Sequence, residues 1–379
     1  MNIGFDAKRL YNNFTGLGNH SRTSMDILTQ YYPENTYYLY TPKIKNHHTM
    51  LQYLDKEHCK TILPPKNTSG SFWRTFRLSN RLIQDKIDLF HGLSNELPVG
   101  IQKRNIPSVV TIHDVAFKSF PDMYHWQDRY IYDLKWKHAI KYADRIIAIS
   151  DFTKQEIIRY YNVDESRIDV VHQPVNPYFY TEDNNELSLD EINRVLSAYP
   201  DDFILYVGSI NSRKNLLGIV KAVELLPKDI QIPIVAVGGD SSYKIEVQQY
   251  IAKHNLQHLV IFPTHRIEDD ELHLLYQKAR LFAFPSFYEG FGLPVVEALL
   301  KGCPVVTSNT SGLVEAGGPY SLQADPHSPE DISNKIQTIL TDDTLRANLI
   351  TEGREFAMKT YHPRILAERL MDAYNKVLK

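Results

Sequence analysis

The sequence predicts an α/β protein built from two doubly wound domains. Short segments rich in Val, Ile, Phe and Tyr alternate with longer helical patterns, which is typical of βα units around a parallel sheet. At 379 residues, the chain is too long for one typical hydrophobic core. A polar segment with two prolines, 173–188, interrupts the alternation, which then restarts.

The first series of elements predicts an N-terminal domain over 1–175. Its expected strands are 2–7, 36–41, 87–92, 108–114, 145–150 and 168–173. Its expected helices are 20–32, 72–86, 127–143 and 151–161. A linker is expected over 176–200.

The second series predicts another domain of the same kind over 201–361. Its expected strands are 203–209, 232–238, 259–263, 281–286 and 304–308. Residues 362–379 follow as an amphipathic helix whose apolar side chains are Ile365, Leu366, Leu370, Met371, Tyr374 and Leu378. This helix must dock, and the N-terminal domain is one candidate partner.

Composition excludes several classes of protein. The net charge of -3, without a long run of one sign, argues against nucleic-acid binding. Cys59 and Cys303 lie far apart and outside any ligand pattern, which predicts a reducing compartment without disulfides or structural zinc. No window approaches about 18 consecutive apolar residues, so we expect a cytoplasmic protein, with peripheral contact at the inner face of the membrane left open.

Arg213 and Lys214 lie between the strand 203–209 and the helical pattern that follows it. Cations are unfavourable beside a helix N-terminus unless they share an anion with its free N–H groups. A phosphate or pyrophosphate fits that description. Two solvated surface cations are the alternative, and the position at a strand end favours the anion.

Gly16 and Gly18 form a second candidate for anion binding, ahead of a helix expected to begin near His20. Glycines allow close approach of the backbone and a positive φ. A Gly-x-Gly pair alone more often marks a flexible turn, and Ser21 stands where a dinucleotide fingerprint has its third glycine.

His113 ends the strand 108–114 and is followed by Asp114. A histidine at that edge can donate to a hydroxyl or a phosphate, or transfer a proton near neutral pH. The alternative is a buried histidine bonded to Asp114, and the residues leave both open.

The stretch FYEGFGLPVVEALLKGCPVVTS, 287–308, carries Glu289 in a loop and Glu297 in the following helix. This placement separates the two carboxylates along one extended ligand and argues against an acid/base dyad. Glu297 is suited to accept from a vicinal diol such as that of ribose, and Glu289 from that of a hexose. Helix-dipole complementation would explain Glu297 alone.

Together these motifs resemble the retaining GT-B glycosyltransferases of the glycosyltransferase 4 type, which carry a Glu-x7-Glu motif. The resemblance covers nearly the whole chain: TGLGNHSR, TIHDVAFKSFPD, ISDFTKQEI, VGSINSRKNL and the segment from FAFPSFYEGFG to VEAGG. It implies two Rossmann-like domains facing across a cleft. The segments Asn19-His20-Ser21 and Glu315-Ala316-Gly317-Gly318 depart from the commoner family pattern.

Carried over by residue, the resemblance implies that Arg213 and Lys214 hold the donor pyrophosphate, with Gly16 and Gly18 nearby. Glu297 would bind the ribose. A catalytic set would then comprise Arg213, Lys214, Glu289 and His113. The remaining donor-binding positions would be Gly208, Phe291, Gly292 and Leu293, with Glu289 and His113 close to the donor sugar.

The resemblance also implies transfer with retention and without a metal or other cofactor, and the chain shows no Asp-x-Asp between a strand and a loop. The expected reaction moves a hexosyl unit from a nucleotide-diphosphate sugar, of GDP-mannose or UDP-glucose type, to a glycan or lipid-linked acceptor in cell-surface polysaccharide synthesis. The alternatives are a GT-B nucleotide-sugar epimerase, which needs its own acid and base, and a non-catalytic nucleotide-sugar-binding scaffold.

Residues 71–86 mix aromatic and aliphatic side chains with Arg74, Arg77 and Arg81. As a helix, this segment suits contact with anionic lipid or a lipid-linked acceptor. The alternative, a core helix with a basic outer face, is favoured by the small number of apolar residues.

Overall fold

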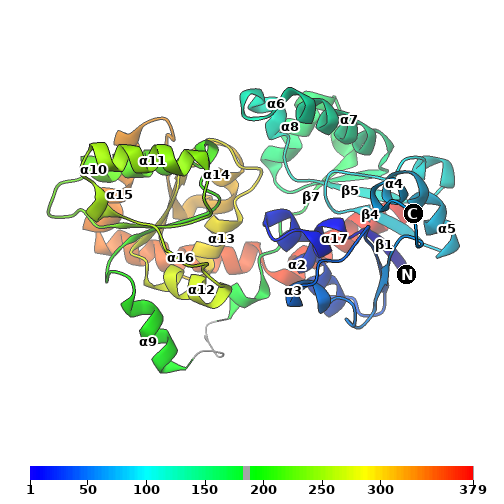
Figure 1. Cartoon of the computed structure of the whole chain (residues 1–379), viewed down its shortest axis with the longest axis horizontal. Coiled ribbons are helices and arrows are strands. Elements are labelled where there is room, and N and C mark those ends of the chain that lie inside the picture. Colours follow the sequence, from blue (N-terminus) through cyan, green and yellow to red (C-terminus); the bar gives the residue numbers. More distant parts are fainter. Residues whose placement is uncertain (182–187, 379) are drawn as a thin grey trace. The chain divides into compact units, whose positions relative to one another are not determined.

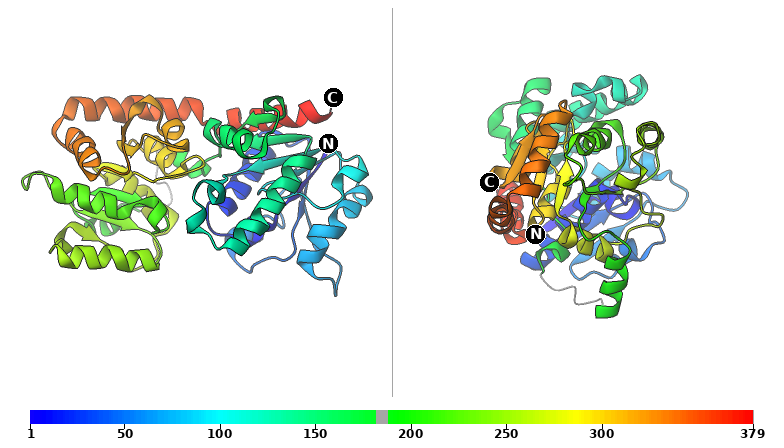
Figure 2. Two further views of the ribbon diagram at one scale, coloured as in Figure 1. Left: turned by 90° about the horizontal axis from the view of Figure 1, so that it is seen from above. Right: turned by 90° about the vertical axis from the view of Figure 1, so that its left-hand side faces the viewer.

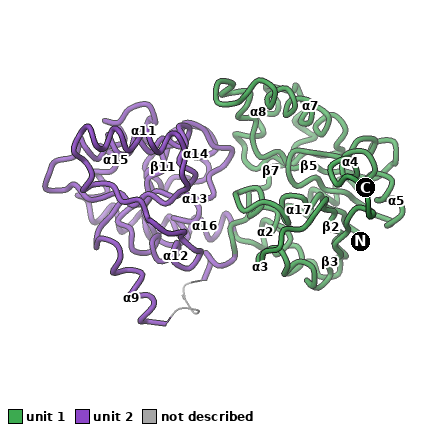
Figure 3. The backbone as a smooth tube through the Cα atoms, in the orientation of Figure 1, with its two compact units in different colours: residues 1–176, 362–379 green, residues 177–361 purple. Residues whose placement is uncertain are grey.

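The computed structural model describes residues 1–181 and 188–378, in two compact units. Unit 1 comprises Met1–Asn176 and His362–Lys379, and unit 2 comprises Pro177–Tyr361 (Figure 3). In each unit a parallel sheet is covered by helices on both faces (Figure 1). The predicted α/β class and doubly wound architecture are therefore confirmed.

The sheet of unit 1 has seven strands in the order β3-β2-β1-β4-β5-β6-β7, and its neighbouring strands pair in parallel. Their bounds are β1 Asn2–Asp6, β2 Thr36–Tyr40, β3 Cys59–Ile62, β4 Leu89–Gly92, β5 Ser108–Ile112, β6 Arg145–Ala148 and β7 Ile168–Val170. The sequence pattern misses β3 because this strand lies at the sheet edge and is only partly buried, so it lacks an apolar run.

The helices of unit 1 pack two separate cores against the two faces of this sheet. Helices α2 and α17 contribute to one core, whereas α5 and α7 contribute to the other, so they lie on opposite sides of the sheet (Figure 2). The bounds are α1 Lys8–Asn12, α2 Gly16–Tyr31, α3 His48–Leu51, α4 Gly70–Phe72, α5 Leu78–Gln84, α6 Ala116–Ser119, α7 Trp126–Tyr142, α8 Asp151–Tyr161 and α17 Pro363–Leu378.

Two helices differ from the sequence pattern. Helix α2 begins at Gly16 rather than near His20, so both glycines lie inside its first turn. The helix expected over 72–86 is divided, because a π-helical segment, Trp73–Arg77, separates α4 from α5. A π-turn alters the angular spacing of the side chains, which a strict 3.6-residue period does not describe.

Helix α17 belongs to unit 1, although it follows unit 2 in the sequence. Its side chains Leu366, Leu370 and Tyr374 are buried in the same core as β1 and α2. The Tyr374 hydroxyl lies 2.8 Å from Nδ1 of His91, which is itself buried on β4. The amphipathic pattern of this segment therefore covers one face of the sheet of unit 1.

The sheet of unit 2 has six strands in the order β10-β9-β8-β11-β12-β13, again parallel. Their bounds are β8 Ile204–Val207, β9 Ile234–Val237, β10 Val260–Ile261, β11 Leu281–Phe284, β12 Val305–Ser308 and β13 Ser321–Ala324. The helices are α9 Leu189–Ser197, α10 Leu216–Leu225, α11 Ser242–Lys253, α12 Asp269–Lys278, α13 Leu293–Leu300, α14 Gly312–Gly317, α15 Pro329–Thr341 and α16 Asp343–Thr360. The pattern misses β13, another partly buried edge strand.

The expected linker, 176–200, is in part regular structure. Helix α9 begins with a complete capping box made by Ser188 and Glu191. Residues 182–187 of the expected linker lie outside the described residues.

Both sheets reverse their strand order at one point, between β1 and β4 in unit 1 and between β8 and β11 in unit 2. Ligands of open α/β sheets bind beyond the carboxyl ends of the strands at such switch points. Among the described residues, no helix is long and apolar enough to cross a membrane.

Candidate functional site

Arg213 and Lys214 follow β8, one of the two strands at the switch point of unit 2. Gly208 ends this strand with φ of +152°, a conformation that suits glycine. A Cβ at Gly208 would lie 3.1 Å from Nζ of Lys214. Glycine at this position therefore makes room for the lysine to fold back over the strand end.

Two asparagines fix the loop that carries these cations. Asn211 accepts from the Lys214 N–H at 3.2 Å, within the 3-10 turn Ser212–Lys214. Asn215, at φ of 56°, caps α10 by accepting from the Gly218 N–H at 3.2 Å. Its amide donates to the carbonyls of Pro285 and Pro326, which ties the loop to neighbouring strand ends. These hydrogen bonds fix the backbone of the loop and so position the two cationic side chains that it carries.

Glu289 comes from the loop after β11 and meets both cations. Its Oε2 lies 2.9 Å from Nη1 of Arg213, and its Oε1 lies 3.4 Å from Nζ of Lys214. The Arg213 guanidinium also donates to the carbonyl of Tyr288. Burial would raise the pKa of Glu289, but the two cations hold that pKa below its ordinary value. The group is a carboxylate shared by two cations.

One oxygen of Glu289 keeps an open position. Within the described part of the chain, the buried Oε1 has no hydrogen-bond partner, because its contact with Lys214 lacks hydrogen-bond geometry. A buried acceptor left unpaired costs about 1–3 kcal/mol. This unpaired acceptor therefore singles out the Glu289 loop among the strand ends of unit 2.

Glu297 lies on α13 in a different environment. Its Oε2 accepts from the Tyr276 hydroxyl at 3.0 Å. Burial raises the pKa of Glu297 to about 7, despite that hydrogen bond. The two glutamates of the Glu-x7-Glu spacing therefore have pKa values shifted in opposite directions. The separation of Glu289 and Glu297 predicted from loop and helix agrees with these different partners.

The loop between the glutamates is tightly packed. Gly292 has φ of +133°, and a Cβ there would lie 2.7 Å from Cδ2 of Leu313. Leu293 starts α13, whereas the Phe291 ring is buried 5.4 Å from the Tyr361 ring. Phe291 therefore packs in the core through its side chain, and its main chain is the part that a ligand can use.

Ser311 supports this loop, and no sequence motif predicts it. It adopts φ of 62° and ψ of -162°, a region that is essentially restricted to glycine. Its hydroxyl accepts from the Glu289 N–H at 3.2 Å, and the next residue, Gly312, donates its N–H to the Glu289 carbonyl at 3.0 Å. A strained residue next to the candidate carboxylate is a signal that only backbone geometry reveals.

A hollow of about 380 Å³ extends along the same sheet edge, beyond the ends of β9 and β10. Its lining includes Gly238, Gly239, Thr264, His265 and Arg266. None of these residues is among the predicted site residues, although polar and glycine residues after strands 232–238 and 259–263 carry the same strand-end signal.

The predicted residues Gly16 and Gly18 lie in unit 1, in the first turn of α2. Neither has a positive φ, and both are helical, so the alternative of a flexible turn does not describe them. Gly18 is required by close packing, because a Cβ there would lie 1.9 Å from the Asn13 carbonyl oxygen. The Asn13 side chain accepts from the Gly18 N–H at 3.1 Å.

His113 is buried in unit 1, and both of its ring nitrogens are occupied. Nε2 lies 2.8 Å from the Leu93 carbonyl and must donate, so Nδ1 accepts from the Gln173 amide at 2.8 Å. Burial lowers the pKa of His113 to about 4. The buried interpretation therefore describes the ring better than proton transfer does, but its partners are Leu93 and Gln173 rather than Asp114.

His20 packs edge-on against His113, with ring centroids 4.6 Å apart. It is buried, and neither ring nitrogen has a hydrogen-bond partner within the described residues. Burial lowers its pKa well below the ordinary value. The sequence pattern marks His20 only as the expected start of a helix.

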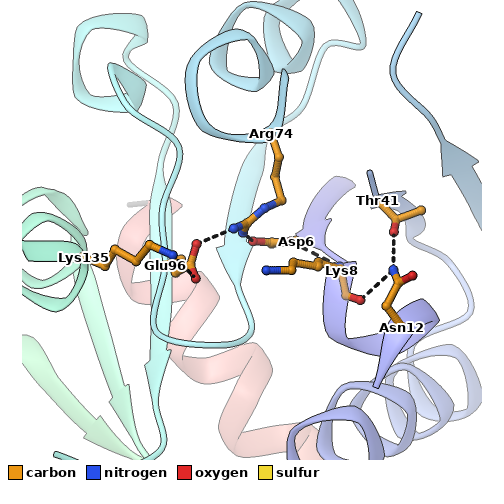
Figure 4. Close-up of polar contacts among 7 residues, drawn as sticks. All are labelled: Asp6, Lys8, Asn12, Thr41, Arg74, Glu96 and Lys135. Atoms are coloured by element: carbon orange, nitrogen blue, oxygen red, sulfur yellow. Dashed lines mark hydrogen bonds and ion pairs between the residues drawn. The ribbon is translucent and has the colours of Figure 1, made fainter. Parts of the chain in front are cut away.

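The switch point of unit 1 holds a buried charge network (Figure 4). The Arg74 guanidinium donates to both Asp6, at the end of β1, and Glu96, after β4. Lys135 of α7 approaches the other oxygen of Glu96 at 3.1 Å. Burial opposes ionisation of Glu96, yet the two cations lower its pKa to about 2. The Lys8 side chain lies beside this network, and burial together with the charge of Arg74 lowers its pKa.

The structure thus brings Arg213, Lys214 and Glu289 into contact, with Gly208 beneath them. Glu297 lies on the helix that follows the Glu289 loop. Gly16, Gly18 and His113 belong to unit 1. The charge network is absent from the predicted site, although Asp6 ends β1 and Glu96 follows β4, so both obey the strand-end rule that predicts Arg213 and Lys214.

Comparisons with known proteins agree with this architecture. Residues 26–179 match the family model Glycosyltransferase Family 4, and 190–356 match Glycosyl transferases group 1. O-antigen chain mannosyltransferase B of Escherichia coli is 33% identical over 271 residues, which cover 70% of this chain and 68% of that protein. The serotype-specific mannosyltransferase WbdA of Escherichia coli is 30% identical over 72% of this chain, which spans 34% of the length of WbdA.

Solved structures share the fold over the whole chain. Sucrose-phosphate synthase of Thermosynechococcus elongatus has a TM-score of 0.78 at 20% identity, covering 100% of this chain and 99% of that one. HepE of Anabaena, solved in complex with UDP-glucose, has a TM-score of 0.74 at 18% identity, covering 99% and 100%. At these identities the likeness shows the fold.

Proposed function

Because the chain belongs to the glycosyltransferase 4 family of group 1 glycosyl transferases, we propose that it transfers a hexosyl unit from a nucleotide-diphosphate sugar to a glycan or lipid-linked acceptor. The two E. coli relatives named as mannosyltransferases favour GDP-mannose as the donor over UDP-glucose. The same relatives favour a role in cell-surface polysaccharide synthesis.

The contact of Arg213 and Lys214 with Glu289 is the observation that carries this proposal. Two cations come together with one carboxylate at a strand switch point, where ligands of open α/β sheets bind. A diphosphate leaving group develops charge as the glycosidic bond breaks, and preorganised cations stabilise that charge. We therefore assign the diphosphate to Arg213 and Lys214, and propose that no bound metal is required.

The carboxylates complete the proposed donor site. Oε1 of Glu289 accepts from a hydroxyl of the sugar, and Glu297 accepts from the ribose diol. The hollow beyond β9 and β10 lies on the same sheet edge and is suited to the nucleobase. Main-chain N–H groups around Gly292 and Leu293 face the sugar and diphosphate. Transfer with retention of configuration is part of the same proposal.

The residues of unit 1 are proposed to shape the site rather than to take part in the reaction. His113 holds a neutral ring whose nitrogens are already used, so we assign it to shaping the surface near the donor sugar rather than to proton transfer. The family resemblance alone supports a proposed part for Gly16 and Gly18 in binding the diphosphate. Peripheral contact with the inner face of a membrane, through residues 71–86, is proposed for the acceptor side.

A thermal-shift panel of GDP-, UDP- and ADP-sugars tests the donor. Ligand binding to the folded state raises Tm by mass action, so GDP-mannose is expected to give the largest increase. The Arg213→Ala/Lys214→Ala variant should give a smaller increase with the same sugars. A panel in which no nucleotide sugar shifts Tm would refute the proposal.

Mass spectrometry of the products separates transfer from the alternatives. Incubation with GDP-mannose and a candidate glycan acceptor should add one hexosyl mass to the acceptor. Conversion of the donor sugar to its epimer would indicate the epimerase instead. Binding with neither release of nucleotide nor transfer to any acceptor would indicate a scaffold.

A further inference from the structure

The outer face of α7 exposes large apolar side chains where a solvated helix would carry polar ones. Trp126, Tyr130 and Leu134, spaced four residues apart, are 69%, 62% and 51% exposed, and Ile131 beside them is 47% exposed. The opposite face of the same helix supplies Trp136 to the core of unit 1. This exposed set is called the α7 stripe below.

The α7 stripe continues into positive charge. At 100° per residue, Lys137 and Lys141 lie on the same side of the helix as Trp126 and Leu134, one to two turns further along. Both lysines are exposed, and Lys137 pairs with Asp133 at 2.7 Å. Over its length α7 carries Arg129, Lys135, Lys137 and Lys141 against Asp128 and Asp133.

The segment α4–α5 presents a second surface of the same kind. Phe72, Phe76 and Ile83 are each about half exposed, and the two phenylalanine rings lie 5.3 Å apart. The exposed Arg77 covers the Phe72 ring at 5.9 Å. Arg74 of this segment is buried in the charge network, so the outer basic residues of 70–86 are Arg77, Arg81 and Lys86, against Asp85. The inner side chains Trp73, Leu78 and Leu82 fill the core, so the outer face is apolar as well as basic.

These two surfaces belong to elements that cover the same face of the sheet. Helices α5 and α7 pack through one core on that face, opposite α17 (Figure 2). Arg74 and Lys135 reach Glu96 from the two elements (Figure 4). Val99, 40% exposed, donates its N–H to the Thr75 carbonyl at 2.8 Å and adds an apolar side chain next to the segment α4–α5.

We infer that the α7 stripe, together with Phe72, Phe76 and Ile83, docks unit 1 on an anionic lipid bilayer. Trp and Tyr side chains favour the interface between headgroups and acyl chains, and lysine stems extend their charge to the headgroups. The excess of basic residues on both elements complements anionic lipid. The inference extends the contact proposed for residues 71–86 to α7 and rests on that part of the proposed function.

Fluorescence of Trp126 tests the depth of docking. The chain has three tryptophans, and Trp73 and Trp136 are buried, at 3% and 9% exposure. Vesicles containing phosphatidylglycerol should shift the emission to shorter wavelength, and brominated acyl chains should quench it. Trp126→Phe should abolish both effects. A protein that does not sediment with phosphatidylglycerol vesicles, or whose Trp126 emission is unchanged by them, would overturn the inference.

A triple variant with a matched control tests the stripe itself. Trp126→Ser/Tyr130→Ser/Leu134→Ser should weaken co-sedimentation with phosphatidylglycerol vesicles by about tenfold or more. The control replaces Leu189, Leu225 and Ile245 of unit 2 by serine, because these side chains are 78%, 53% and 57% exposed. The control should bind as the unchanged protein does. Equal binding by the stripe variant contradicts the inference.

Two further measurements distinguish lipid docking from self-association and from donor binding. Light scattering after size exclusion should give the same mass for the protein and for the stripe variant. If the protein is a dimer and the variant a monomer, the stripe binds a second copy of this chain, and lipid docking is overturned. The stripe variant should keep the thermal shift with nucleotide sugars. The thermal shift therefore tests donor binding, and co-sedimentation separately tests vesicle binding.

Discussion

The two strand switch points both hold charged clusters, but they differ in how completely their carboxylates are paired. In unit 1, Arg74 bridges the carboxylates of Asp6 and Glu96, Lys135 pairs with Glu96, and the half-buried Lys8 lies beside them. In unit 2, Arg213 and Lys214 both contact Glu289, and one oxygen of that glutamate has no hydrogen-bond partner within the described residues.

This difference suggests a division between support and binding. A buried network whose members satisfy one another fixes the backbone and offers little to a ligand. A cluster at a strand end whose carboxylate keeps an unpaired acceptor is completed by a ligand that brings hydroxyl groups. Variants at the two clusters should therefore fail in different assays.

Removal of Arg74 should have the largest effect on stability. Arg74→Met leaves Asp6 and Glu96 buried without their shared cation, which is expected to cost about 3–5 kcal/mol in the free energy of unfolding. Urea denaturation measures this change. Arg77→Met, at an exposed arginine on the same segment, should change it by less than about 0.5 kcal/mol. Equal effects of the two variants would show that the network is not a structural support.

Removal of the unit 2 cations should act on turnover. Arg213→Ala/Lys214→Ala is expected to reduce kcat by about 10²–10³-fold, because the charge on the departing diphosphate loses its stabilisation. Donor affinity should fall by a smaller factor. Steady-state kinetics with the donor identified by thermal shift measure both quantities.

A control for this variant removes two exposed cations of the same unit, Lys228→Ala/Lys253→Ala. This pair should leave kcat unchanged. Unchanged turnover in Arg213→Ala/Lys214→Ala would show that these cations have a structural role, like the cluster of unit 1.

The paired histidines of unit 1 should respond unequally. His113→Phe leaves the Leu93 carbonyl and the Gln173 amide unpaired, at an expected cost of about 1–3 kcal/mol. His20→Phe breaks no hydrogen bond of the described residues and should change stability by less than about 1 kcal/mol. Thermal unfolding of both variants measures the difference. A larger loss for His20→Phe would reveal a structural bond of its ring.

Glu297 should impose a pH dependence on stability. Its pKa is about 7 in the folded protein against an ordinary 4.5, so the folded state retains a proton that the unfolded state has lost. Its stabilising contribution is present below pH 4.5 and is lost as pH rises to about 7, by roughly 1–2 kcal/mol after allowance for partial exposure. Glu297→Gln should remove this component from urea titrations at a series of pH values.

Glu96 should impose a pH dependence of stability with the opposite sign. Its pKa is lowered to about 2, so its contribution is present above pH 4.5 and is lost as pH falls toward 2. Glu96→Gln should therefore flatten the acid limb of the stability curve, whereas Glu297→Gln acts between pH 4.5 and 7. Curves that change in the same window would contradict the different environments of the two groups.

The sequence predicts the buried strands well because central strands of a parallel sheet are continuous apolar runs. It fails at β3 and β13, where partial exposure breaks that run, and at the division of α4 from α5, where a π-helical segment changes the period. The hydrophobic pattern identifies strands that are buried on both faces, whereas these two edge strands are only partly buried.

The candidate site was likewise predictable only in part. Arg213, Lys214 and Glu289 were predictable because each follows a strand, and parallel strands bring their ends together. The strain at Ser311 and the open oxygen of Glu289 depend on backbone angles and packing that no spacing encodes. The α7 stripe was missed because its aromatic residues suit a core as well as a surface, and only their exposure decides between the two.

Helix α17 has a consequence for the order in which the protein is made. Unit 1 is completed by residues 362–379, yet unit 2 lies between them and Asn176. At a synthesis rate of about 5–20 residues per second, roughly 10–40 seconds separate the first part of unit 1 from its missing helix. During that interval the face of β1 and β4 later covered by α17, including the His91 partner of Tyr374, is open on the ribosome. The nascent chain therefore offers chaperones an apolar surface that the finished protein no longer has.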